Sequence, residues 1–541
     1  MILSKQNDFL ACAIYSLLAF ALSSLLLQFS YFIGHDGVWY ARIAENIIAG
    51  KGICVNIGEP YVDHPPLYPF LIGLINLLFR NLEFSAHFIS MLAFSLAIFP
   101  LFHLTKDIYS ANTAHWASIL YVTNGFLLIH SNLVLAESLF VLLTLAQFYW
   151  VHKIIQDSTH PLKASALIGI LSGAAYLARP EGLVFYIAGI LAILVCTPGN
   201  LPYKKRGIAL SGAIFLLFFI PHLHFIHKNT HKFQLSVAIN EIFIKRQLDV
   251  SHPGRYLDVK KIYEGLTDDK TRLKLDELKE NFKLTDYLTK DNYALLKSGF
   301  KSILWRWLEL NKYLFCGFGF FFIGASFLGA PWNRKRKKSE FLLLLFLLTI
   351  IPQFFGIFHP KRYFLYFPIF LIWMGNGIET TKNWAGASFS LGRRSTIGVP
   401  IIVCLILALF SGGYLYRTIR DDPSAYEYKE LGEWMKKNIP DISREYVAAR
   451  HPSVIFYSGA KLLHPPYFPY VDNFDDFLNY MKHQGAKYFV IGEDLEPPAS
   501  DSYRALLDET IPLPSGIFRR HVIRGKKKVS LFEISSQESS T

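Results

Sequence analysis

Charged residues are scarce in this chain of 541 residues. They make up 18% of the sequence, whereas a soluble domain carries roughly 25%, and 52% of the residues are hydrophobic. So few charges cannot cover the apolar surface of the folded chain, and lipid must be the solvent for much of it. The scarcity excludes an ordinary soluble protein and predicts a polytopic α-helical membrane protein.

Cysteine is also rare, and no two cysteines share a loop. Cys12, Cys196, Cys316 and Cys404 lie in apolar segments and Cys54 lies in a polar loop, so no disulfide framework is predicted. The sequence lacks a zinc-binding spacing, a P-loop, a GxSxG motif, a Rossmann fingerprint and a haem motif in a usable context. Hydrolases and nucleotide-driven pumps are therefore unsupported, and no cofactor is firmly implied.

The chain does carry an excess of basic residues, with a formal net charge of +13. In a soluble protein such an excess would suggest nucleic acid as a partner. Here the basic residues fall in short runs between apolar segments, where topology signals and contacts with anionic lipids are found. We therefore expect membrane lipids, and not nucleic acid, as partners.

About eleven segments are long and apolar enough to cross a bilayer as helices. The first apolar stretch, Asp8 to Ile33, is too long for a signal peptide and has no clear cleavage site, so we expect a retained helix. The predicted spans are residues 10–33, 84–104, 113–130, 136–152, 163–178, 183–197, 208–226, 313–331, 339–358, 362–379 and 398–416.

Basic residues predict the orientation of these spans. With the N-terminus and Lys5 in the cytoplasm, each short loop that then lies on the inner side contains basic residues, as the positive-inside rule requires. These loops contain Lys106, Lys153, Lys163, residues 204–206, residues 334–338 and residues 393–394. The C-terminal segment from Arg417 onward then lies outside.

Residues 67–79 are apolar but number only about 13, fewer than a span needs. If they were counted as a span, every later loop would lie on the opposite side of the membrane, and residues 333–338 would lie outside. We therefore predict a short helix at the outer interface, with a tilted full span as the alternative.

The sequence predicts two domains, a transmembrane catalytic domain over residues 1–416 and a small extracytoplasmic α/β domain over residues 417–541. The first has external loops at 34–83 and 227–312, and the charged stretch 268–283 predicts amphipathic surface helices. In the second, helices are predicted at 426–438 and 474–484, and strands at 445–449, 453–457, 487–491 and 529–534.

Ionisable residues near membrane helix ends are candidates for function, because placing them there is energetically costly. Asp36 follows the first span and precedes a helical pattern from Val38 to Ile48, whose positive end would favour its charge. A plain N-terminal cap is the alternative. Arg42 lies on the same short helix.

Asp63 and His64 precede two prolines at the start of segment 67–79. An acid and a histidine there could hold a phosphate or a metal, and a plain turn is the alternative. Together, Asp36, Asp63 and Glu137 could bind a divalent metal.

Glu137 begins the fourth span, where helix capping is the alternative to a functional role. Arg179 lies in a tight outer turn, Arg-Pro-Glu-Gly, where a salt bridge within the turn is the alternative. His359, Lys361 and Arg362 lie outside against the positive-inside trend, so an anionic lipid head group, especially a phosphate, is their natural partner.

Taken together, these features resemble the GT-C membrane glycosyltransferases, and in particular family 39, which includes the protein O-mannosyltransferases and the aminoarabinose transferases. The segments that carry the resemblance are HDGVWYARIAENI, DHPPLYPFLIG, LVLAES, LARPEG and PKRYFLYFPI, followed by YKELGEWMKKNIP, VIFYSG and GAKYFVIGED in the tail. The resemblance covers nearly the whole chain through the order of these segments and the topology.

The resemblance implies transfer of a sugar from a polyprenyl-phosphate donor to an acceptor hydroxyl at the outer face of a bacterial plasma membrane. Asp36 would be the general base of an inverting reaction, with Glu137 as a second catalytic carboxylate. Arg179, Lys361 and Arg362 would bind the donor phosphate.

His64 stands where relatives often carry lysine, and would also contact the phosphate. Asp63, Arg42 and His359 would support the site. Gly37 departs from the Asp-Glu pair of many O-mannosyltransferases, and the WWDYG-type motif of oligosaccharyltransferases is absent. A transporter of lipid-linked sugars and an inactive glycan-binding relative are the alternatives.

Overall fold

The computed structural model of the chain is mostly helical and carries a small C-terminal sheet, which confirms the predicted fold class. It describes residues 2–56, 58–156, 160–197, 202–236, 293–329, 332–351, 360–390, 392–420, 426–449, 451–462, 478–479, 481–482, 485–493 and 506–535. The chain divides into two compact units. We call them the membrane unit (1–31, 62–239 and 296–422) and the sheet unit (32–61, 240–295 and 423–541), and describe each by itself.

Every predicted span overlaps at least one helix of the membrane unit. The helices are α1 (Ile2–Ser30), α3 (Leu67–Phe79), α4 (Leu82–Leu96), α5 (Ile98–Ile108), α6 (Ala111–Thr123), α7 (Gly125–Asn132), α8 (Glu137–Ile155), α9 (Pro161–Ala178), α10 (Gly182–Cys196), α11 (Pro202–Thr230), α16 (Tyr293–Tyr313), α17 (Phe318–Leu328), α18 (Arg334–Leu348), α20 (Phe367–Ser388) and α21 (Arg393–Arg420), with the 3₁₀ turns η1 (Phe315–Gly317) and η2 (Pro360–Leu365).

Fewer helices than predicted are both long enough and apolar enough to cross a membrane. Within the described ranges, six are long and apolar enough, and a bent pair formed by α16 and α17 would make a seventh. Several of the remaining predicted spans are shorter or broken; α6, for example, ends at Thr123, and the side chain of the next residue, Asn124, caps α7. The protein is an integral membrane protein, but the count of eleven stays a prediction.

The short apolar helix α3 has the predicted bounds. Its 13 residues would extend about 20 Å, which is less than the roughly 30 Å hydrocarbon core. It ends at Phe79, because the next residue, Arg80, adopts a left-handed conformation, and α4 begins after Asn81, whose side chain accepts a hydrogen bond from the Phe84 amide. The structure thus confirms a short helix, while its place at the outer interface stays a prediction.

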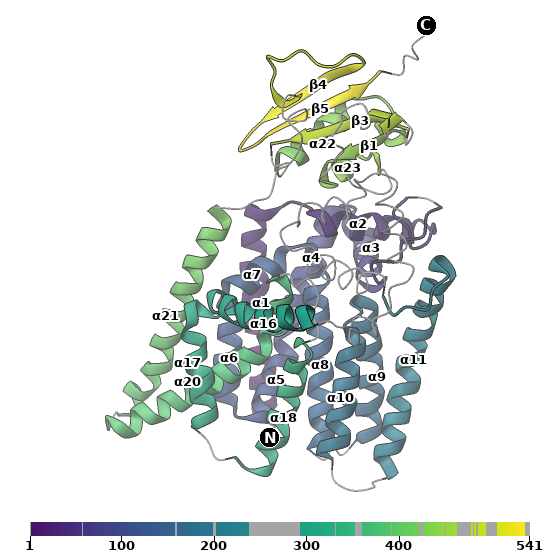
Figure 1. Cartoon of the computed structure of the whole chain (residues 1–541). Helices are drawn as coiled ribbons and strands as arrows, with labels where there is room; N and C mark the ends of the chain where they lie inside the picture. The colour runs from purple at the N-terminus through teal and green to yellow at the C-terminus, as the bar shows by residue number, and fades with distance from the viewer. Residues whose placement is uncertain are drawn as a thin grey trace. The chain divides into compact units, whose positions relative to one another are not determined.

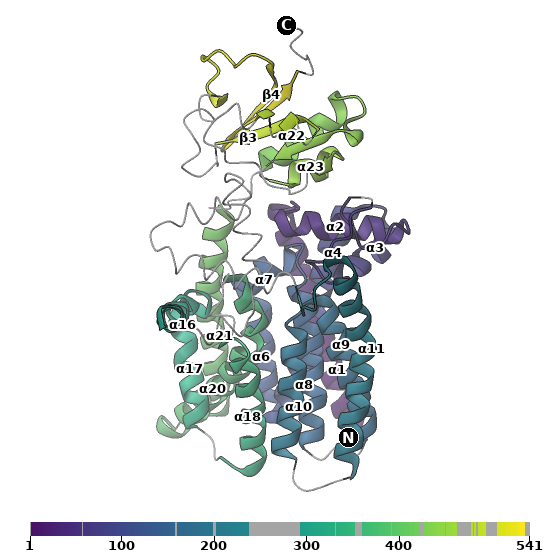
Figure 2. The same ribbon diagram turned by 45° about the vertical axis from the view of Figure 1, so that its right-hand side comes forward.

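Helix α8 lies beside α9 and α10 (Figure 2), and its two ends have different surroundings. At its C-terminal end, Lys153 pairs with Asp107 at 2.5 Å, and Lys338 donates to the carbonyl oxygen of Ile155. Glu137 lies at the other end, about 28 Å away along the 19-residue helix. Basic residues from predicted inner loops therefore gather opposite Glu137, as the topology requires. Which end faces the cytoplasm stays a prediction.

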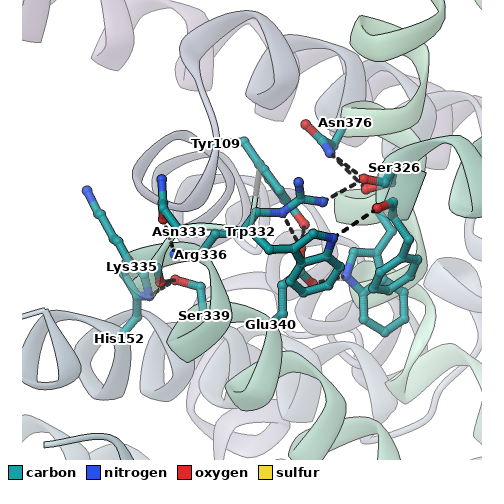
Figure 3. A network of polar contacts seen from close by, with 12 residues as sticks. Tyr109, His152, Ser326, Trp332, Asn333, Lys335, Arg336, Ser339, Glu340 and Asn376 are labelled. Atoms are coloured by element: carbon teal, nitrogen blue, oxygen red, sulfur yellow. Dashed lines mark hydrogen bonds and ion pairs between the residues drawn. The ribbon is translucent and has the colours of Figure 1, made fainter. Parts of the chain in front are cut away.

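One basic residue of the predicted inner loop 334–338 is buried. Helix α18 begins at Arg334, before the predicted span, and Arg336 is only 5% exposed. Its guanidinium lies 3.3 Å from Glu340, donates to the carbonyl of Ser326 at 2.6 Å and stacks on Trp332 (Figure 3). Because Glu340 also accepts hydrogen bonds from Tyr109 and Trp373, this network ties α17, α18 and α20 together.

The sheet unit contains a five-stranded sheet in the order β2-β1-β3-β5-β4 (Figure 1). Strand β1 runs parallel to β2 and β3, whereas β5 pairs antiparallel with both β3 and β4. The elements are α2 (His35–Ile48), α22 (Tyr426–Asn438), η3 (Ile442–Arg444), β1 (Tyr446–Ala449), α23 (Ser453–Ser458), β2 (Lys461–Leu462), β3 (Ala486–Gly492), β4 (Ile517–Arg524) and β5 (Lys528–Ile534).

The predicted elements of the tail are mostly present. Helix α22 has the predicted bounds, and β1, β3 and β5 cover three of the predicted strands. Residues 453–457, predicted as a strand, instead form helix α23, because Pro452 favours a helix start and Gly459 ends the helix at a left-handed φ of 76°. Strand β4 was not predicted, and most of the predicted helix 474–484 lies outside the described residues.

Residues 32–61 fold with the C-terminal part of the chain. The Ile33 amide donates to the Tyr457 hydroxyl at 2.9 Å, and the Ser453 hydroxyl donates to the Ile33 carbonyl at 2.8 Å. Trp39 stacks on Tyr61 and belongs to the apolar core under α22 and β3. The compact units therefore divide the chain differently from the predicted domains 1–416 and 417–541.

Candidate active site

Two glutamates share one arginine at the Glu137 end of α8. Nη1 of Arg179 donates to Oε1 of Glu137 at 2.6 Å, and Nη2 donates to Oε1 of Glu181 at 2.9 Å. Glu137 is only 1% exposed, so this ion pair is almost fully withdrawn from water. The salt bridge within the turn, considered as an alternative for Arg179, is present, together with a second one to another helix.

The local sequence explains how Arg179 leaves its helix. Helix α9 ends at Ala178, and Arg179 adopts an extended conformation with φ −152° and ψ 137°. The residue before a proline is disfavoured in helical conformation, so Pro180 favours this break. Helix α10 begins at Gly182, where a Cβ atom would collide with the backbone of Tyr176. This close packing of α9 and α10 holds Arg179 between the two helix ends.

Arg362 joins this group from a distant part of the sequence. It lies in η2, just before α20, and interacts electrostatically with Glu181, Arg179 and Glu137. We call these four residues the carboxylate–arginine cluster. Lys361, its neighbour in η2, is half-buried. The structure therefore brings together Glu137, Arg179 and Arg362, which the sequence singled out one by one.

Electrostatics keep Glu181 ionised. Burial alone would raise the pKa of this carboxyl, but the Arg179 and Arg362 guanidinium groups outweigh burial and lower the pKa to about 2. The carboxylates of Glu137 and Glu181 hold and orient Arg179, so an incoming anion would meet an ordered guanidinium group there, with Arg362 also in the cluster.

One carboxylate oxygen of the cluster is not used by its arginine. Oε2 of Glu137 is buried and accepts no hydrogen bond within the part of the chain that the structure describes. A buried acceptor without a donor costs about 1–3 kcal/mol. The oxygen can therefore accept a hydrogen bond from a hydroxyl group of a ligand.

Asp63 and His64 lie in the turn that leads into α3, and both are half-buried. Tyr68, in the first turn of α3, interacts electrostatically with Glu137 and forms a 2.6 Å hydrogen bond with Ser90. The start of α3 thus lies near the carboxylate–arginine cluster.

Asp36 and Arg42 belong to the sheet unit. Gly34, and not Asp36, is the N-terminal cap of α2, and Asp36 lies in the first turn of that helix. Arg42 donates from Nη2 to the carbonyl oxygens of Ile455 and Ala460, each at 3.1 Å. Arg42 therefore holds α2 against the end of α23.

The remaining candidates add little to the geometry. His359 lies outside the described residues. In the described part of the chain, no three His, Cys, Asp or Glu side chains are grouped so as to hold a metal ion. Sequence reasoning missed that Glu137 and Arg179 pair with each other. The available signal was that both lie at predicted outer helix ends.

Comparison with known proteins supports a specific fold. Residues 63–225 match the family Dolichyl-phosphate-mannose-protein mannosyltransferase. No curated protein sequence matches the chain.

The chain resembles the structure of ArnT from Cupriavidus metallidurans bound to undecaprenyl phosphate, with 13% identity, a TM-score of 0.59, and coverage of 97% of this chain and 98% of ArnT. It also resembles the Archaeoglobus fulgidus oligosaccharyltransferase AglB in complex with an inhibitory peptide and a dolichol-phosphate, with 13% identity, a TM-score of 0.57, and coverage of 90% and 69%.

A third similar structure is the mycobacterial arabinofuranosyltransferase AftD, with 11% identity and a TM-score of 0.52. The match covers 99% of this chain but only 42% of AftD. The chain therefore has the fold of the GT-C membrane glycosyltransferases and, as its sequence predicted, resembles the family 39 type.

Proposed function

We propose that this protein transfers a sugar from a polyprenyl-phosphate donor to an acceptor hydroxyl at the outer face of the membrane. The carboxylate–arginine cluster, buried at one end of a GT-C helical bundle, is the observation that carries this proposal. Two similar structures were determined with a polyprenyl-type phosphate, undecaprenyl phosphate in ArnT and dolichol-phosphate in AglB. A lipid phosphate is thus the anion that the paired arginines are expected to bind.

The arginines would act on the leaving group. As the bond from the sugar to the phosphate breaks, negative charge grows on the phosphate oxygens, and oriented cations stabilise it. Arg179 is fixed by Glu137 and Glu181, while Arg362 approaches from η2 with Lys361 beside it. His64 would add a donor to the same phosphate when protonated.

The two acidic candidates would have different roles. We assign Asp36 as the general base that removes the acceptor proton while the hydroxyl attacks the anomeric carbon, which inverts the configuration. Glu137 would orient Arg179 through Oε1 and accept a hydrogen bond from the donor sugar through Oε2.

Binding of undecaprenyl phosphate to the purified protein in nanodiscs tests the phosphate site. Arg362→Ala should weaken binding at least tenfold, because a charge-assisted contact to phosphate is lost. Lys163→Ala, which removes an exposed cation at the opposite end of α9, should leave binding unchanged. Equal binding of undecaprenol, which lacks the phosphate, would refute the assignment.

A comparison of lipid and glycan masses in cells with and without the protein identifies the sugar and the acceptor. Loss of one glycosylated species, restored by the wild type but not by Arg362→Ala, is the expected result. Donor binding without any lost product would favour a transporter of lipid-linked sugars instead.

A further inference from the structure

Helix α16 lies across the long helices of the membrane unit (Figures 1 and 2). Residues 303–313 of this helix are bent by 96° from the segment that contains α17. The bend is built into the backbone, since Phe315, Cys316 and Gly317 all have positive φ angles. A helix cannot continue through three left-handed residues, so the chain must change direction here.

The outward face of α16 is apolar. Leu304, Trp305, Trp307 and Leu308 are exposed, with Trp305 67% and Leu308 55% exposed. Their spacing of one, three and four residues places them on one broad side of the helix. On a water-facing surface such a patch would require a partner.

The helix that follows the bend also exposes apolar side chains. After the bend, Phe318, Phe321 and Leu328 of α17 are also exposed, with Phe321 63% exposed. Because α17 is almost entirely apolar and belongs to an integral membrane protein, lipid is the only solvent that fits these side chains. The exposed apolar residues of α16 belong to the segment that directly precedes α17 across the bend.

Polar side chains near this apolar face indicate how deep α16 lies in the bilayer. Exposed Lys301 and Lys312 flank the apolar residues, and Arg306 pairs with Glu309 at 2.7 Å. Tryptophan and lysine are typical of helices that lie at the level of the lipid head groups, where lysine meets anionic lipid.

Helix α16 is also joined to the segment that carries Arg362. The Tyr363 hydroxyl donates to the carbonyl oxygen of Arg306, and the rings of Tyr313 and Tyr363 lie 5.7 Å apart. Trp307 contacts Phe370, in the first turn of α20. The depth of α16 in the membrane is thereby linked to the position of η2.

We propose that α16 is an interfacial helix seated in the head-group layer of an anionic bilayer, and that Tyr363 transmits this seating to Lys361 and Arg362. Tyr363 is a positioning residue in this account and does not contact the substrate. The location of α16 stands independently, whereas its effect on donor binding rests on the proposed function.

Depth-dependent quenching tests the location. Cys316 is the only exposed cysteine and can be replaced by Asn, which tolerates its positive φ of 56°. Bimane probes at Trp305→Cys and Leu308→Cys should be quenched most by nitroxides near the head groups. A probe at Phe321→Cys should be quenched by nitroxides deep in the chains, and one at Arg520→Cys, in the sheet unit, only by aqueous iodide. If the α16 probes are quenched like the probe at Phe321→Cys or like the probe at Arg520→Cys, α16 does not lie in the head-group layer.

The link is tested with two matched variants in anionic nanodiscs. Tyr363→Phe removes only the hydroxyl that binds Arg306 and should weaken undecaprenyl phosphate binding about three- to tenfold, the range of one hydrogen bond. Tyr186→Phe removes a comparable hydrogen bond, to Ser211 at 3.3 Å, and should have no effect.

If Tyr363→Phe, Tyr186→Phe and the wild type all bind undecaprenyl phosphate equally well, the proposed link between α16 and Arg362 is wrong. If the wild type itself does not bind undecaprenyl phosphate, the proposed function fails, while the quenching result still decides the location of α16.

Discussion

At the scale of single residues, Arg179 shows how the cluster is held together. Its two terminal nitrogens donate to one carboxylate in α8 and one in the turn before α10, which a planar guanidinium can do in a fixed geometry. The sequence marked both Glu137 and Arg179 because of their costly positions at helix ends. It could not show that they touch, because that contact depends on how α8 and α9 pack.

Replacing Arg179 by Lys tests this geometry. Lysine keeps the charge but has a single nitrogen, which cannot bind Glu137 and Glu181 as the fork does. We expect undecaprenyl phosphate binding in nanodiscs to fall about tenfold or more, as a charge-assisted contact is lost. Binding equal to that of the wild type would show that only the charge of Arg179 matters.

Glu181 predicts how the cluster responds to acid. Its pKa is lowered from 4.5 to about 2 in the folded protein. A lowered pKa stabilises the fold above pH 4.5, and this contribution is lost as the pH falls toward 2. The contribution is about 3 kcal/mol at pH 6 and about 1 kcal/mol at pH 3.

The thermal midpoint in detergent micelles, measured for the wild type and for Glu181→Gln, checks this expectation. The wild type should be clearly more stable at pH 6, and the difference should shrink at pH 3. A difference that does not change with pH would contradict the assigned ionisation of Glu181.

At the scale of elements, most helices and strands could be predicted from the periodicity and the length of their apolar segments. Helices α3 and α22 begin and end where the sequence placed them, because prolines, charges and turn residues mark their ends. Helix α23 was predicted as a strand, since six residues rich in β-branched and aromatic side chains fit either structure. Pro452 and Gly459 mark its ends, and its packing against α22, where Gly432 leaves room for Tyr457, also favours the helix.

Helix α2 gives a second prediction at this scale. Arg42 was expected to support catalysis, yet its guanidinium binds two carbonyl oxygens next to α23. Arg42→Ala should therefore destabilise the sheet unit by about 2 kcal/mol, the range for hydrogen bonds from a charged group.

Limited proteolysis of the full chain measures this loss as faster cleavage. Lys436→Ala, which removes an exposed charge from α22, should be cleaved at the wild-type rate. Lost sugar transfer in Arg42→Ala with unchanged proteolysis would assign Arg42 to catalysis instead.

At the scale of the whole molecule, the charge pattern predicted two chemically different ends of the helical bundle. Basic residues meet at the C-terminal end of α8, and the carboxylate–arginine cluster lies at its start. The joining of residues 32–61 to the C-terminal sheet could not be predicted. It depends on contacts between residues more than 400 positions apart, such as the one from Ile33 to Tyr457.

Labelling of single cysteines in intact cells tests the orientation. In a background with Cys316→Asn, a probe that cannot cross the membrane should miss Lys335→Cys, in the predicted inner loop. The same probe should react with Lys437→Cys in the predicted outer domain, since both positions are exposed. The reverse labelling pattern would show that the orientation is inverted and that the proposed site does not lie at the outer face.

Turnover of the lipid donor tests the central claim most directly. Proteoliposomes with the wild-type protein and a total extract of the source membranes, which supplies both the lipid-linked sugar and the acceptor hydroxyl, should release polyprenyl phosphate and a glycosylated product. Asp36→Asn should fold and bind undecaprenyl phosphate, yet release at least a hundredfold less, because the general base is lost. Wild-type turnover in Asp36→Asn would contradict the assigned base, and no release by the wild type would contradict glycosyl transfer itself.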